Sequence, residues 1–80
     1  AMVEMLCETD FVAQNEEFRQ MTRDIAMQVA AMGAENVADL LQQDFIKDPE
    51  KTIDLLIKSL SGKIGEKMIL SRFERFAIGA

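Results

Sequence analysis

The sequence predicts an α+β domain in which two long helices and one short helix pack on one face of a small antiparallel sheet. Two observations lead to this class. Apolar and polar residues alternate near both ends of the chain, which is typical of strands. Between these segments, apolar residues recur every three or four positions, which is typical of amphipathic helices. The chain has 80 residues, enough for one small domain, and we expect residues 1–80 to form it.

The first predicted element is a strand over residues 3–8. Apolar residues at positions 3, 5 and 7 fall on one face of this strand, and acidic residues at positions 4 and 8 fall on the other. Leu6 interrupts the polar face, which favours some cover over that side of the strand.

The first long helix is predicted from Asn15, a good N-cap, to Gly33, a natural C-terminal stop. A short helix over residues 36–43 is expected to follow, with Asn36 as its cap. The apolar stripe of the long helix consists of five residues at helical spacing: Phe18, Met21, Ile25, Val29 and Met32.

The second long helix is predicted to start at Pro49, which suits the first position of a helix, and to end before Gly65. A longer strand over residues 67–78 completes the β–α–α–α–β order. Since two strands alone make a poor sheet, either the helices cover it well or it has a further strand beyond this sequence.

Composition argues against several classes of function. With no histidine and one cysteine (Cys7), the chain lacks the usual general base, a cysteine–histidine zinc site and an internal disulfide. We therefore expect no catalytic residue, no metal and no cofactor, and a reducing compartment. No apolar run approaches the roughly 18 residues that span a bilayer, so no membrane helix is expected.

The net charge of −5 is unevenly distributed. Residues 1–50 carry eleven acidic residues against three basic ones, and residues 51–80 carry six basic residues against three acidic ones. An acidic chain is a poor match for a phosphate backbone, and we expect no direct nucleic-acid partner. The alternative is that four residues form a modest basic patch that binds nucleic acid: Lys63, Lys67, Arg72 and Arg75. A solvent-exposed face with no such role is the favoured interpretation of these residues.

The corner after the first strand is the unusual feature of the sequence. Thr9 and Asp10 favour turns and caps, yet Phe11 and Val12 follow them at once. Either both apolar residues pack back on the core as a staple for the next helix, or at least one projects to fill a pocket of a partner.

The run Glu-Thr-Asp-Phe-Val-Ala at residues 8–13 resembles the signature of elongation factor Ts. Residues 45–49 (Phe-Ile-Lys-Asp-Pro) and 63–67 (Lys-Ile-Gly-Glu-Lys) also resemble that family, in the same order, so the resemblance covers nearly the whole chain. The family usually has asparagine where Leu6 and Lys67 stand.

The resemblance implies a fragment of the factor's core, its N-terminal, dimerisation-type subdomain, working in the cytoplasm as a guanine nucleotide exchange factor for elongation factor Tu. Such factors act by contact and are not enzymes. In the family the Asp-Phe pair enters the GTPase domain of elongation factor Tu near its Mg²⁺ site. Carried over, Phe11 is the wedge, Asp10 a flanking polar contact, Val12 a supporting apolar contact, and Thr9 shapes the turn.

Family members also have an N-terminal helical module and usually a second related subdomain, and neither lies in these residues. The sequence therefore predicts weak binding and slow exchange by this chain. The alternative is a structural module without exchange activity, forming a homodimer through the unpaired edge of its first strand. Gly65 and Glu66 are interpreted as structural, and Arg72 and Arg75 as partners of nearby acids.

Overall fold

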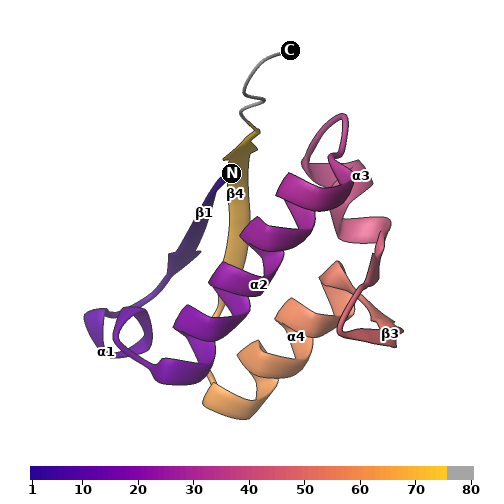
Figure 1. Ribbon diagram of the computed structural model, residues 1–80. Coiled ribbons are helices and arrows are strands. Elements are labelled where there is room, and N and C mark those ends of the chain that lie inside the picture. The colour runs from indigo at the N-terminus through magenta and orange to yellow at the C-terminus, as the bar shows by residue number, and fades with distance from the viewer. Residues whose placement is uncertain (76–80) are drawn as a thin grey trace.

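The structure is a computed structural model that describes residues 1–75 of the chain. It confirms the α+β class (Figure 1). The elements follow one another as β1 (Met2–Cys7), α1 (Asp10–Ala13), α2 (Glu16–Met32), α3 (Val37–Gln42), β2 (Asp44–Phe45), β3 (Asp48–Thr52), α4 (Ile53–Ile64) and β4 (Met68–Glu74).

The two ends of the described chain form one antiparallel ribbon. β1 pairs with β4 so that Cys7 lies opposite Met68 and Met2 lies opposite Glu74, with a bulge after Glu4. In Figure 1 the two long helices run side by side, with this ribbon on one side of them and the short β2–β3 hairpin on the other. The expected single sheet is therefore joined by a second one.

The first long helix, α2, begins where the sequence predicts. The Asn15 side chain accepts a hydrogen bond from the Phe18 backbone N–H at 3.1 Å, and Gly33 ends the helix with a φ of 69°. The predicted stripe is buried through its first four members, whereas Met32 in the last turn is exposed. An unexpected residue, Gln28, is buried on the same face of the helix.

The predicted start of the second long helix is wrong. Residues 48–52 form strand β3, and α4 begins at Ile53 with Thr52 as its N-cap. Pro49 holds the residue before it in an extended conformation, and the Thr52 hydroxyl accepts a hydrogen bond from the Leu55 N–H at 3.2 Å. Because the better cap lies three residues after the proline, the extended chain continues to it.

The predicted second strand is present as β4, which ends at Glu74. The later part of the prediction, with Phe76 and Ile78, lies outside the described residues. The four-residue helix α1 was not predicted, because so short an element has no period to read.

One apolar core lies between the ribbon and the helices. Its buried members come from every element except β1 and β3, and the half-buried Val3, Met5 and Cys7 of β1 pack against them. No helix in the described part of the chain combines the length and apolar character needed to cross a bilayer. The buried residues of the core are Val12, Phe18, Met21, Ile25, Val29, Leu40, Phe45, Ile53, Ile57, Leu60, Met68 and Leu70.

Gln28 links α2 to the segment that follows α3. Its amide nitrogen donates to the Gln43 side-chain oxygen at 3.1 Å and to the Asp44 carbonyl at 3.0 Å. Its own oxygen accepts from the Ile46 N–H at 3.0 Å. Since a buried amide needs partners for both of its ends, this set of bonds explains why a polar residue is tolerated in the stripe.

Candidate functional site

A tight corner follows β1. Thr9 is the N-cap of α1: its backbone is extended, and its side-chain oxygen accepts from the Val12 N–H at 3.4 Å. The carbonyl of Val12 then accepts from the Asn15 N–H at 2.9 Å, which brings the chain directly into α2. The backbone of residues 9–15 is therefore held by local hydrogen bonds on both sides of the apolar pair.

Phe11 and Val12 lie on opposite sides of this corner. The Val12 side chain is 2% exposed and belongs to the core, whereas Phe11 is 88% exposed. Consecutive residues on a helix point about 100° apart, so anchoring one of them in the core directs the other outward. The staple interpretation holds for Val12 and fails for Phe11.

The surroundings of Phe11 are polar. Glu8, Thr9 and Asp10 are all exposed. Asp10 lies in the first turn of α1, where the helix dipole stabilises a carboxylate. The cap itself comes from Thr9 rather than from Asp10. The arrangement is one apolar ring on a polar rim, which is the usual anatomy of an anchor residue at a protein interface.

The corner is tied to the far end of the chain by one side-chain contact. The Thr9 hydroxyl donates to the Glu66 carboxylate, with distances of 3.0 and 2.9 Å to its two oxygens. Glu66 follows Gly65, the left-handed C-cap of α4, and lies 57 residues after Thr9. The sequence predicts only a structural role for Glu66, because no sequence pattern links residues so far apart.

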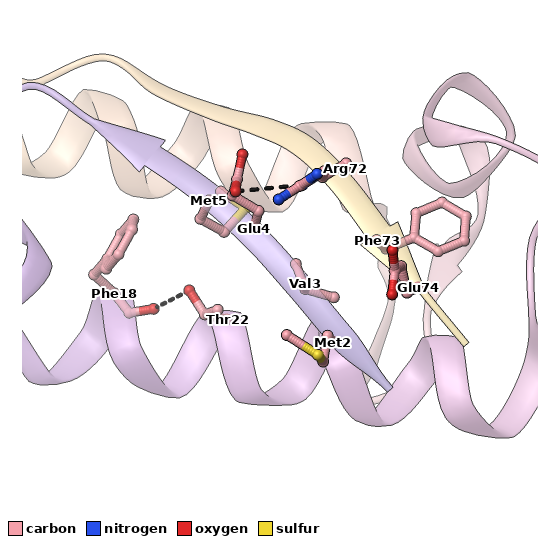
Figure 2. A pocket seen from close by; sticks show the side chains of 9 residues that line it. All are labelled: Met2, Val3, Glu4, Met5, Phe18, Thr22, Arg72, Phe73 and Glu74. Carbon is pink, nitrogen blue, oxygen red and sulfur yellow. Dashed lines mark hydrogen bonds and ion pairs between the residues drawn. The ribbon is translucent and has the colours of Figure 1, made fainter. Parts of the chain in front are cut away.

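A groove opens on the other half of β1 (Figure 2). It has a volume of about 480 Å³, and Phe18 and Thr22 reach it from α2. Glu4 and Arg72, which both line the groove, form an ion pair across the ribbon at 3.3 Å, as expected for Arg72. The predicted site residues 9–12 do not line this groove. Its lining consists of Met2, Val3, Glu4, Met5, Phe18, Thr22, Arg72, Phe73 and Glu74.

Most basic residues of the second half of the chain bind acidic side chains or a carbonyl of the same molecule. Lys63 pairs with Glu17 at 2.8 Å. Arg75, expected to pair with an acid, donates instead to the carbonyl of Ala30 at 3.3 Å, so the expectation for this residue is wrong. Cys7 is half-buried, and its thiol contacts the Thr9 carbonyl at 3.4 Å. Within residues 1–75, no group of three or more acidic, histidine or cysteine side chains is arranged to hold a metal ion.

Comparison with known proteins gives a consistent result. The family model described as elongation factor Ts matches residues 8–80. Elongation factor Ts of Thermodesulfovibrio yellowstonii is 34% identical over 122 residues, covering 98% of this chain and 61% of that protein. The factors of Clostridium tetani and Clostridium novyi are 40% and 41% identical, covering 98% and 95% of this chain and 26% and 25% of their own lengths.

The chain thus spans 61% or less of these relatives. The alignment with the Thermodesulfovibrio protein extends over 122 residues, more than the 80 of this chain, so that relative carries additional residues inside the matched region.

Proposed function

The chain belongs to the elongation factor Ts family, and from that premise we propose that it promotes GDP release from elongation factor Tu through its corner at residues 9–12. The observation that carries the proposal is the Phe11 ring, 88% exposed beside a neighbour that is buried. An apolar ring held outward by a fixed backbone is preorganised for insertion into a partner, because little freedom remains to be lost on binding.

The four residues of the corner have different roles in this proposal. Phe11 enters the GTPase domain, and Asp10 makes a polar contact beside it. Thr9 forms the turn by capping α1. Val12 supports the contact from within, because its burial in the core fixes the direction of the adjacent ring. The chain would correspond to a core subdomain of a translation factor that works in the cytoplasm.

Exchange of this kind rests on differential affinity. A factor speeds GDP release only if it binds the GTPase better when the Mg²⁺ and phosphate contacts are loosened. Burial of one phenylalanine contributes about 2 kcal/mol, which is roughly a thirtyfold bias between two states of the partner. No bond is made or broken, so the proposed activity needs no catalytic side chain.

The affinity of the chain for GDP-bound elongation factor Tu tests the proposal. Phe11→Ala is expected to weaken binding roughly thirtyfold, because an anchor residue contributes a large share of the binding free energy. Ile46→Ala is the matched control, because Ile46 is 53% exposed but lies in the β2–β3 turn. Equal binding by wild type and Phe11→Ala would contradict the proposal.

Self-association through β1 is the second candidate function. Within the described residues β1 pairs only with β4, so one of its edges has no strand beside it. An unpaired edge is a template for strand addition, and the groove beside Phe18 adds an apolar floor for a second copy. Sedimentation at two concentrations decides this, since a chain that remains monomeric at the higher concentration does not self-associate.

A further inference from the structure

We infer that Glu66 is a positioning residue for Phe11: its carboxylate holds the Thr9 hydroxyl and thereby fixes the direction in which the corner presents the ring. The inference rests on the proposed function and adds to it a residue from the opposite end of the described chain. It joins two segments that the sequence shows only as separate blocks, residues 8–13 and residues 63–67.

The Thr9 hydroxyl takes part in two hydrogen-bonding interactions, one as donor and one as acceptor. Its proton is directed to Glu66, with both carboxylate oxygens within 3.0 Å, and its oxygen accepts from the Val12 N–H. A hydroxyl has one proton and two lone pairs, so donation to the carboxylate leaves the lone pairs free for the cap. Glu66 therefore selects the rotamer of Thr9 in which the cap of α1 forms.

Glu66 is itself firmly placed. Its backbone carbonyl accepts from the Ser61 hydroxyl at 2.6 Å, and the N–H of Gly65 donates to the Ser61 carbonyl at 2.8 Å. Gly65 has a φ of 82°, a conformation that side-chain-bearing residues rarely adopt. Glu66 thus follows directly from the capped C-terminus of α4, and this helix is itself anchored because its Ile57 and Leu60 side chains lie in the core.

The corner needs such a support. A helix of four residues is far below the length at which a helix holds itself in water. Without Glu66, the corner keeps its local backbone hydrogen bonds and the burial of Val12, but the hydroxyl that caps α1 is free to rotate. We expect the added freedom to weaken binding to elongation factor Tu by roughly three- to tenfold, since ordering a mobile segment on association is unfavourable.

The test measures the affinity of GDP-bound elongation factor Tu for variants of the 80-residue chain. Glu66→Ala is expected to weaken binding by about three- to tenfold, and Glu66→Gln, which keeps an oxygen able to accept from Thr9, is expected to recover most of the loss. Glu50→Ala removes an exposed acid from β3 and serves as the charge control, with wild-type affinity expected.

Double variants separate positioning from other roles. In a Phe11→Ala or a Thr9→Val background, Glu66→Ala is expected to have no further effect, because Glu66 acts through both residues. An equal loss in all backgrounds would mean direct contact with the partner or general destabilisation, and would overturn the inference. If Phe11→Ala weakens binding and Glu66→Ala does not, the proposed function survives and only the inference fails.

A measurement on the free chain needs no partner. In Glu66→Ala, hydrogen exchange at the Val12 amide is expected to become faster by roughly three- to tenfold, because the cap opens more often. The Phe18 amide, capped independently by Asn15, is the internal reference and is expected to keep its rate. An unchanged rate at Val12 would overturn the inference whatever the outcome with elongation factor Tu.

Discussion

Among the polar side chains that join distant segments of the described chain, Gln28 and the Thr9–Glu66 pair differ most clearly in burial. At the junction of α2 with the β2–β3 hairpin, Gln28 is 2% exposed and bonds at both ends of its amide. At the corner after β1, Thr9 is exposed and Glu66 is half-buried. A buried, fully bonded amide is expensive to disturb, whereas an exposed bond contributes little to stability. We therefore expect the first contact to maintain the fold, and we infer that the second orients a surface residue.

Replacement of Gln28 is expected to have the largest effect on the stability of the chain. Gln28→Leu leaves the Asp44 carbonyl and the Ile46 N–H without their partner, and we expect a loss of about 2–3 kcal/mol in the free energy of unfolding. Urea unfolding measures this loss. Gln42→Leu, on the exposed face of α3, is the control, with a change within about 0.5 kcal/mol expected. A loss no larger than that of the control would mean that this junction does not maintain the fold.

The adjacent residues of the corner provide the next test. Val12→Ala removes two buried methyl groups and is expected to lower the free energy of unfolding by about 2 kcal/mol. Phe11→Ala is expected to change it by no more than about 0.5 kcal/mol, because the ring is exposed. Urea unfolding of both variants measures the contrast. Equal destabilisation would show that Phe11 packs against the chain, and the division between the two residues would be lost.

Replacement of the two asparagine caps is expected to have the smallest effects on stability. Asn15 caps α2 beside the corner at 3.1 Å, and Asn36 caps α3 at the other end at 2.8 Å. Each Asn→Ala change is expected to lower the free energy of unfolding by about 1 kcal/mol. Neither is expected to alter affinity for elongation factor Tu by more than about twofold, since neither holds Thr9. A much larger loss of affinity in Asn15→Ala alone would extend the recognition site into α2.

The sequence predicted the parts of the fold that have a strong period. The stripe of Phe18, Met21 and Ile25 located α2 because each residue faces the same core, and alternation located both strands of the ribbon. β3 was missed because its residues are polar and because Pro49 suits the start of a helix as well as a strand at an edge. Gln28 lies three residues after Ile25, so its position on the stripe indicates burial. Its polar side chain argued against burial, and the residue was therefore not assigned to the core.

The candidate site was predictable only in part. The resemblance pointed to residues 9–12 and to Phe11 as the projecting ring. The residue pattern alone could not tell which of Phe11 and Val12 faces solvent, because that depends on how a four-residue helix meets α2. The contact of Thr9 with Glu66 was beyond prediction, since it spans 57 residues and follows from the packing of α4 against the ribbon. Local sequence determines caps and periods, whereas contacts between separate elements depend on the whole fold.

The most direct test is the rate of GDP release from elongation factor Tu, followed with a fluorescent GDP analogue at a limiting concentration of the chain. Wild type and Ile46→Ala are expected to accelerate release equally, and Phe11→Ala is expected to be roughly thirtyfold less effective while remaining folded. Equal acceleration by wild type and Phe11→Ala would contradict the account, because the exposed ring would then have no part in exchange.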